Sequence, residues 1–259
     1  MNQQAHLQSD ARDGRAGRVL RMAAAADLHC SRASQGALQM LFAQISEAAD
    51  ALVLAGDLTD NGRPEEARLL ARELTTLRVP AVAVLGNHDF ETGQQDEVSR
   101  ILVDAGVTVL DGEACEVQGI GIAGVKGFAG GFGQHALGPW GEPSIKQFVH
   151  EAVSEALKLE AALARLRSRQ RVVLLHYSPV QETVDGEPLE IYPFVGSSRL
   201  EEPIGQFPVS LVFHGHAHRG RAEGRTKSGV PVYNVSLPLL TRVYPDRPPF
   251  RVVEMPVDE

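Results

Sequence analysis

Five short blocks of this chain carry histidine, aspartate or asparagine side chains, and nearly every block directly follows a run of apolar residues. Such groups are costly to bury alone, but metal ions can satisfy several of them together. The pattern therefore predicts a hydrolase that uses two metal ions. The blocks are Asp27-Leu28-His29, Gly56-Asp57, Gly86-Asn87-His88-Asp89, His176 and Gly215-His216-Ala217-His218.

The first two blocks offer carboxylate and imidazole ligands. Asp27 and His29 are two residues apart at an expected strand end. Both side chains would then point to the same side of an extended backbone, where they could chelate one ion. Asp57 could bridge two ions with its two oxygens, and the glycine before it permits a close approach of the backbone. The alternative is that Asp57 caps the following turn or helix.

The third block is the most specific of the five. Asn87 offers a neutral amide oxygen, and Asp89 could hold the tautomer of the neighbouring His88 and favour its protonated form. A turn built on asparagine and aspartate is the alternative. That alternative leaves unexplained why three successive expected strands all end in ligand-type residues.

The histidines of the last two blocks support the metal hypothesis together rather than singly. His176 alone is typical of an ordinary histidine at the end of a strand. His216 and His218 follow an apolar run as a pair and need polar partners. His214 is one residue out of phase with His216, and we interpret it as a supporting or simply packed residue. Without a metal site, five blocks would have to coincide at strand ends independently.

Alternating strands and helices must position these blocks. Apolar runs predict parallel strands over residues 19–26, 51–55 and 79–85, with helices over 35–49 and 64–77 between them. In open α/β sheets, ligands bind at the carboxyl ends of the strands, which is where the blocks fall. We also expect a helix over 96–105 and strands over 107–110, 114–117, 120–125 and 172–175.

The second half of the chain is less regular. A glycine-rich stretch over 124–141 precedes Ser144 and Gln147, a capping-box signature for a long helix that reaches about Arg169. A loop over 177–208 is long enough to be a functional loop. A strand is expected over 209–213, and residues 230–235 and 250–255 are predicted as closing strands of a second sheet.

Composition favours one compact domain over residues 18–259, preceded by a polar leader over residues 1–17. The net charge of −8 disfavours nucleic acid and anionic membranes as partners, although bound metal ions would still attract a phosphate. No apolar stretch is long enough to span a bilayer, and the leader lacks the core of a signal peptide. With only Cys30 and Cys115, a disulfide framework is not expected, which favours a cytoplasmic protein.

In order, and in the spacing of about thirty residues between the first three, the five blocks resemble those of the calcineurin-like metallophosphoesterase superfamily. The resemblance covers residues 19–233. It implies an α/β fold, a four-layer α/β/β/α sandwich of two mixed sheets flanked by helices, with a binuclear metal site between the loops.

The resemblance also implies a ligand set in which two metal ions share one carboxylate. One ion would be held by Asp27, His29 and His218, the other by Asn87, His176 and His216, and the bridge would be Asp57. Manganese, iron, zinc and mixed pairs all suit such nitrogen and oxygen ligands, so the sequence leaves the metal open.

The implied activity is hydrolysis of phosphoester bonds, by a small-molecule phosphodiesterase or phosphatase. A hydroxide that bridges the metal ions would attack phosphorus in line. His88 would stabilise the reacting phosphoryl group or protonate the leaving oxygen, with Asp89 behind it, where many members have glutamate. The sequence contains no nucleophile elbow and no Walker lysine, which disfavours a covalent route and nucleotide-driven chemistry.

Contacts to a small-molecule phosphoester substrate are harder to assign. Arg199, Lys126 and Tyr177 are candidates, each with the alternative of a solvated charge or a packed ring. A nuclease with the same site is a second hypothesis, which the acidic composition disfavours. A catalytically silent metal-binding scaffold is a third, although a scaffold has no physical need for buried imidazoles. The natural substrate, the preference for diester or monoester, and the oligomeric state stay open.

Overall fold

The apolar runs of the first third of the chain form the parallel strands of a five-stranded sheet. The computed structural model describes residues 18–34 and 36–257, so the expected leader over residues 1–17 lies outside the described residues. The strand order is β11-β1-β2-β3-β4, with only β11 antiparallel to its neighbour. The strands are β1 (Val19–Ala25), β2 (Ala51–Ala55), β3 (Ala81–Val84), β4 (Val107–Val109) and β11 (Arg251–Pro256).

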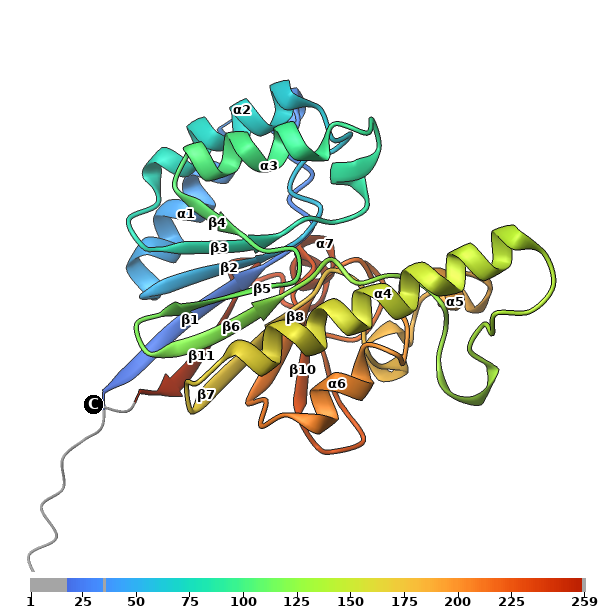
Figure 1. Cartoon of the computed structure of the whole chain (residues 1–259). Coiled ribbons are helices and arrows are strands. Elements are labelled where there is room, and N and C mark those ends of the chain that lie inside the picture. The colour runs from blue at the N-terminus through green and yellow to red at the C-terminus, as the bar shows by residue number, and fades with distance from the viewer. Residues whose placement is uncertain (1–17, 35, 258–259) are drawn as a thin grey trace, which may run out of the picture.

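Three amphipathic helices cover the outer face of this sheet (Figure 1). They are α1 (Ala37–Ala48), α2 (Pro64–Glu73) and α3 (Gln95–Asp104). In α1, Leu38, Phe42 and Ile45 share one buried face, as the helical period requires. Proline at the start of α2 lies where its missing amide proton costs nothing. Each helix thus follows a strand and carries the chain back to the end of the sheet where the next parallel strand begins.

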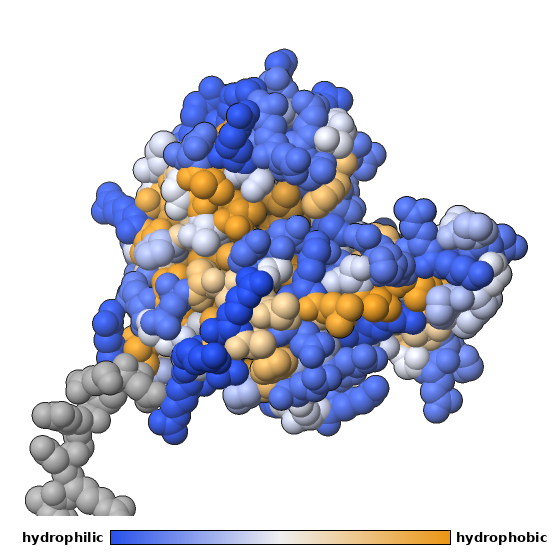
Figure 2. Space-filling view, in the orientation of Figure 1, coloured by the Kyte–Doolittle hydropathy of each residue, from blue (hydrophilic) through white to orange (hydrophobic). Residues whose placement is uncertain are grey.

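The second sheet has six strands in the order β5-β6-β7-β8-β10-β9. Their bounds are β5 (Glu113–Val117), β6 (Ile120–Gly124), β7 (Gln170–Leu174), β8 (Leu211–His214), β9 (Glu223–Arg225) and β10 (Pro231–Asn234). The long α4 (Pro143–Arg165) packs with α6 (Glu201–Gln206) over its outer face. Figure 2 shows a hydrophobic stripe over α4, where Val153 and Leu157 are exposed.

The two sheets pack face to face through a continuous apolar core. Met22 and Val53 of the first sheet belong to the same buried cluster as Ile122, Leu174 and Phe213 of the second. Fully burying one such side chain contributes about 1.5–3 kcal/mol relative to leaving it in water. The architecture is therefore the four-layer α/β/β/α sandwich that the sequence predicts (Figure 1).

Three expectations about the elements are wrong. The strand near the C-terminus, β11, pairs with β1 and so closes the first sheet, because its register with Val19–Ala24 is antiparallel at the sheet edge. The long helix begins at Pro143 with Glu142 as its N-cap, so Ser144 lies inside the first turn, and it ends at Arg165 because Leu166 is extended. The stretch over 177–208 is not a structureless loop.

That stretch contains helices too short to show periodicity. They include α5 (Tyr192–Val195) and α6. Outside this stretch, the sequence also did not indicate α7 (Leu237–Val243). The single-turn 3₁₀ helices are Arg32–Ser34, Leu74–Thr76, His88–Phe90, Gly133–His135, Gln181–Val184 and Leu189–Ile191. Among residues 18–34 and 36–257, no helix combines the length and the apolar composition needed to cross a membrane.

Candidate metal centre

The five blocks meet where the two sheets present the carboxyl ends of their strands. Backbone hydrogen bonds hold the loops against one another: the His29 amide donates to Asp57 O at 3.0 Å, and the Gly215 amide donates to His176 O at 3.2 Å. The first of these bonds joins the loops after β1 and β2, and the second joins those after β7 and β8. Side chains that are far apart in the sequence are thus fixed on a shared backbone frame.

These loops contain residues in a backbone conformation, with positive φ, that residues other than glycine rarely adopt. Asp27, His29, Asp57 and His216 have φ values of 57°, 42°, 48° and 68°. The expectation that Asp27 and His29 point to one side of an extended strand is therefore wrong, although both side chains do reach the same group of ligand atoms. Residues held at positive φ store strain, which clusters at functional sites.

Two glycines permit the close approach of these loops. At Gly56, where φ is 84°, a Cβ atom would overlap the ring of His176. At Gly86, a Cβ atom would overlap the Asp57 carboxylate and backbone amide. The expected reason for glycine before Asp57 is thus confirmed, and Gly86 has the same function at the next loop.

The first group of ligand atoms comes from Asp27, His29 and His218, whose donor atoms lie within 4.8 Å of one another. The Nε2 atom of His218 lies 3.3 Å from Asp27 Oδ1. Burial alone would raise the pKa of Asp27, but the hydrogen bond with His218 and the charge of His176 lower it. Both ring nitrogens of His29 are shielded from solvent, yet they form no hydrogen bond within residues 18–34 and 36–257.

The second group comes from Asp57, His176 and His216, again within 4.8 Å. The Nδ1 atom of His176 faces Ala55 O at 2.9 Å, and since a carbonyl only accepts, Nδ1 carries the proton. Its Nε2 atom then faces two further acceptors, Asn87 Oδ1 at 2.9 Å and Asp57 Oδ1 at 3.3 Å. Three acceptor atoms at this separation need a proton or a cation between them.

The pKa of His176 agrees with the need for a proton or a cation at its Nε2, and the pKa of His216 suits a neutral ring. Burial lowers the pKa of His176, but the charge of Asp57 outweighs it and raises the pKa to about 9. Burial lowers the pKa of His216 to about 4, which keeps that ring neutral, as a metal ligand must be. Its Nε2 atom donates to Phe194 O at 3.2 Å and leaves Nδ1 with its lone pair.

Asp57 lies between the two groups. Its Oδ1 faces His176, and its Oδ2 lies 3.9 Å from Nε2 of His29. The backbone amide of His88 donates to Oδ1 at 2.9 Å, and this bond and the neighbouring histidines lower the pKa of the carboxyl against the effect of burial. The His29 nitrogens, which lack hydrogen bonds within the described residues but face the carboxylates of Asp57 and Asp60, the facing acceptors at His176 and this shared carboxylate fit two metal ions.

The structure corrects the expected function of Asp89. Its carboxylate accepts four hydrogen bonds, from the amides of Leu58, Thr59 and Gly86 and from the Thr59 hydroxyl, at 2.6–3.1 Å. It therefore fixes the loops rather than the ring of His88. That ring donates from Nδ1 to Asp60 O at 2.7 Å, so a backbone carbonyl sets the tautomer.

His88 itself lies beside the first group of ligand atoms. Its ring is 4.5 Å from that of His29, centroid to centroid, at a steep angle. Its donor atom also lies within 4.8 Å of those of His29 and Asp57. With Nδ1 committed to the backbone, the Nε2 atom of His88 is the one available to a bound molecule.

Of the three candidate substrate contacts, Tyr177 packs its side chain against a ligand residue, whereas Lys126 meets one through its backbone, where its carbonyl accepts from the His176 amide at 3.0 Å. The ring of Tyr177 lies 4.5 Å from that of His216. Lys126 donates to Gly127 O at 2.9 Å and lies over the rings of Phe128 and Tyr177, and burial lowers its pKa. Arg199 donates to Leu137 O at 2.7 Å, so this guanidinium holds the glycine-rich stretch.

A hollow of about 380 Å³, which we call the aromatic recess, opens beside the second group of ligand atoms. Sequence reasoning missed most of its wall, although the apolar residues of 191–194, in an otherwise polar stretch, were an available signal. The lining residues are Asn87, Phe128, Ala129, Phe148, Tyr177, Ile191, Phe194, Val195 and His216.

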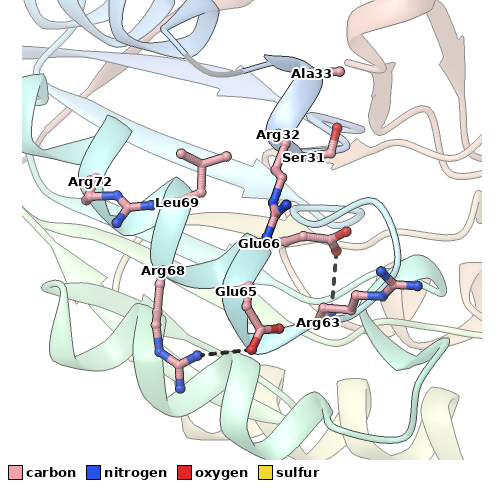
Figure 3. A pocket seen from close by; sticks show the side chains of 9 residues that line it. All are labelled: Ser31, Arg32, Ala33, Arg63, Glu65, Glu66, Arg68, Leu69 and Arg72. Atoms are coloured by element: carbon pink, nitrogen blue, oxygen red, sulfur yellow. Dashed lines mark hydrogen bonds and ion pairs between the residues drawn. The ribbon is translucent and has the colours of Figure 1, made fainter.

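A second hollow, of about 800 Å³, lies between the segment after Cys30 and helix α2 (Figure 3). We call it the arginine pocket. Its lining includes no residue of the ligand blocks. Arg68 pairs with Glu65 at 3.6 Å, and Glu66 accepts from the Arg63 amide at 3.3 Å. The lining residues are Ser31, Arg32, Ala33, Arg63, Glu65, Glu66, Arg68, Leu69 and Arg72.

This chain is similar in sequence to a protein named as a phosphodiesterase. A probable glycerophosphodiester phosphodiesterase, GpdQ, of Arcobacter nitrofigilis is 26% identical over 178 residues, which cover 66% of this chain and 57% of that protein. The chain thus spans little more than half the length of this relative.

Solved structures share the fold at low identity. A phosphopantetheinyl hydrolase of Mycobacterium tuberculosis superposes with a TM-score of 0.64 at 17% identity, over 90% of this chain and 95% of that one. A purple acid phosphatase of yellow lupin, Lupinus luteus, gives 0.55 at 13% identity, over 86% and 44%.

The family comparison covers most of the chain. The model of the calcineurin-like phosphoesterase family matches residues 20–220, which include all five ligand blocks. Most of the sandwich lies in the same stretch, and β9, β10, α7 and β11 follow it. This chain is a member of the calcineurin-like phosphoesterase family.

Proposed function

We propose that this protein hydrolyses phosphoesters of small molecules with two bound metal ions, and that it prefers diesters. The observation that carries the proposal is Asp57, whose two oxygens face two separate groups of imidazole and carboxylate donors. Family membership supports a hydrolase acting on phosphoester bonds. The diester preference is supported by the relative named as a glycerophosphodiester phosphodiesterase.

In this proposal, residues 18–259 form one catalytic domain. Asp27, His29 and His218 hold one ion, and Asn87, His176 and His216 hold the other, with Asp57 between them. Manganese, iron and zinc all suit this set. The bound ions supply positive charge against the phosphoryl oxygens and acidify water, so that hydrolysis proceeds near neutral pH.

His88 acts on the leaving oxygen. Its Nδ1 proton is committed to Asp60 O, so the proton that it transfers comes from Nε2. After transfer, the neutral ring keeps the Nδ1 proton and the same hydrogen bond, and no rearrangement is needed. Asp89 keeps the loop of His88 in place through the amides that it accepts.

The direct test is hydrolysis of bis(4-nitrophenyl) phosphate and of 4-nitrophenyl phosphate by the Mn²⁺-reconstituted protein. We expect turnover of the diester to exceed that of the monoester. The Asp57→Asn variant should lose bound metal and activity together, because both ions lose a ligand. Two retained ions with full activity in that variant would refute the metal assignment, and turnover of the monoester alone would make the protein a phosphatase.

A further inference from the structure

Five rings and one backbone carbonyl surround the aromatic recess in a closed circuit. The ring of His216 lies 4.5 Å from that of Tyr177, and Tyr177 lies 6.0 Å from Phe128, centroid to centroid. Phe128 lies 4.9 Å from Phe148, which lies 6.5 Å from Phe194. The circuit closes where Phe194 O accepts the hydrogen bond from His216 Nε2. The wall is thus continuous and built from five separate places in the chain.

The recess is apolar and open. Its wall leaves Phe194 57% exposed and Ile191 38% exposed, although both are large hydrophobic residues. Its volume of about 380 Å³ falls within the range of small-molecule sites. The described residues that line it include no charged side chain, and its polar members are Asn87, Tyr177 and His216. Such a wall suits a flat apolar group and gives poor compensation for burying a polyol or a charge.

The recess is joined to the ligand set. Asn87 and His216 line it and also belong to the second group of ligand residues. A phosphoryl group held at the ligand residues therefore has this wall beside it. His88 is not among the residues that line the recess, and its donor atom groups with those of His29 and Asp57 instead. Because His88 delivers its proton to the leaving oxygen, the ester arm that stays on phosphorus faces the recess.

We propose that the aromatic recess binds an aryl or similarly flat apolar group, carried on the ester oxygen of a phosphodiester that remains attached to phosphorus. This inference rests on the proposed function and names its substrate class. In the reaction, the oxygen of water bonds to phosphorus, the bond from phosphorus to the leaving oxygen breaks, and that oxygen takes up a proton. The product in the recess is the monoester of the apolar group.

The kinetic test compares two diesters with the same leaving group, phenyl 4-nitrophenyl phosphate and methyl 4-nitrophenyl phosphate. With the Mn²⁺-loaded protein, and after division by the rates with Mn²⁺ alone, we expect kcat/KM to be about tenfold higher for the phenyl diester. The Phe194→Ala and Phe148→Ala variants should lower this ratio by about fivefold each. The side chain of Phe194 is exposed, and the Ala variant keeps its carbonyl, so the bond to His216 survives.

The matched control is Leu157→Ala on α4, because Leu157 is also 57% exposed but lies outside the recess. It should leave the ratio unchanged. Hydrolysis of both diesters without a preference would overturn the recess inference and leave the proposed function standing.

A second measurement decides the inference independently of turnover. In saturation-transfer NMR with the zinc-loaded protein, the ring protons of phenylphosphonate should receive saturation, and the Phe194→Ala variant should lose it. Methylphosphonate is the reference probe. If neither diester is hydrolysed, the proposed function fails, and this spectrum alone then tests the recess. Equal saturation in the wild type and in Phe194→Ala would overturn the inference.

Discussion

The aromatic recess and the arginine pocket are two hollows of opposite chemistry, and they share no lining residue. The arginine pocket is the roomier, at about 800 Å³ against 380 Å³, and it gathers four arginines against two glutamates in a chain of net charge −8. Only the recess shares residues with the ligand blocks. Volume and charge would favour the arginine pocket as the phosphate site, whereas continuity with the ligand atoms favours the recess.

Several charged groups of the arginine pocket already have partners, and this is the physical reason why the larger and more charged hollow is not the expected phosphate site. Acidic side chains and backbone groups already occupy part of the arginine pocket: Arg68 pairs with Glu97 at 2.8 Å, and Glu66 serves the turn before α2. In the centre beside the recess, by contrast, Nε2 of His176 faces Asn87 Oδ1 and Asp57 Oδ1 and needs a proton or a cation between them, and both ring nitrogens of His29 lack a hydrogen bond within the described residues. Chemistry is therefore expected where polar groups lack partners rather than where charge is abundant.

The largest effect should follow from removing a residue that serves both the recess and the ligand set. In His216→Ala, the second ion loses a ligand and the recess loses part of its wall, so kcat/KM should fall by about 1,000-fold or more. Metal content after dialysis, measured by mass spectrometry beside the kinetics, checks this. His135→Ala, in the glycine-rich stretch, is the control. Unchanged metal content in His216→Ala would show that His216 belongs to the recess wall but does not bind metal.

A smaller effect should follow from displacing the shared carboxylate without removing it. In Gly86→Ala, the new Cβ would overlap the Asp57 carboxylate. We expect metal affinity to fall by about 10–100-fold, because a ligand is shifted and not lost. Gly205→Ala is the matched control, since its nearest neighbour lies 4.0 Å away. Titration of both variants with Mn²⁺ measures the effect, and equal affinities would contradict it.

A buried histidine behind the ligand set should make stability depend on pH. His214 donates from Nδ1 to Gly215 O and accepts at Nε2 from the Thr183 hydroxyl, both at 2.8 Å. Burial lowers its pKa from an ordinary 6.5 to about 4. The unfolded chain therefore binds a proton between these pH values and the folded chain does not, so the free energy of unfolding falls as the pH drops from 6.5 towards 4.

The loss attributable to His214 is on the order of 3 kcal/mol. Denaturant unfolding of the wild type and of His214→Gln across this pH range isolates it, because other titrating groups cancel in the difference. The wild type should lose stability relative to the variant as the pH falls. Parallel curves would mean that His214 does not titrate in this range.

The smallest effect is expected in the arginine pocket. Arg32→Ala and Arg63→Ala should change kcat/KM for phenyl 4-nitrophenyl phosphate by less than about twofold, because exposed charges contribute little and an uncharged ester arm offers them no partner. Steady-state kinetics at low and at physiological salt measures this. A tenfold loss in either variant would show that this pocket also binds the substrate and would end the contrast between the hollows.

The sequence predicted the layers and the converging blocks because both depend on local patterns. Apolar runs followed by Asp57, Asn87 or His176 are visible along the chain, and the same end of parallel strands must bring them together. The backbone of Asp27 and His29 was not predictable, since positive φ arises from packing of one loop on the next. The pairing of Asp89 with the amides of neighbouring loops was hidden for the same reason.

The aromatic recess could not be predicted from the sequence for a different reason. Phe128, Phe148 and Phe194 belong to the glycine-rich stretch, to α4 and to α5, and only tertiary packing makes them one wall. No periodicity links such positions. Likewise, β11 joins β1 across nearly the whole chain length, and its composition does not say which sheet it completes.

Phe194 contributes to the protein through two different groups of atoms, its backbone carbonyl and its ring. Its carbonyl supports His216, and its ring forms part of the recess. Every amino acid carries the carbonyl, whereas only the side chain changes by mutation. Under the proposed function, evolution can therefore exchange the ring that selects the ester arm while the carbonyl that supports the proposed metal ligand His216 is inherited unchanged. Position 194 is a point at which related enzymes could diverge in substrate without first losing their catalytic centre.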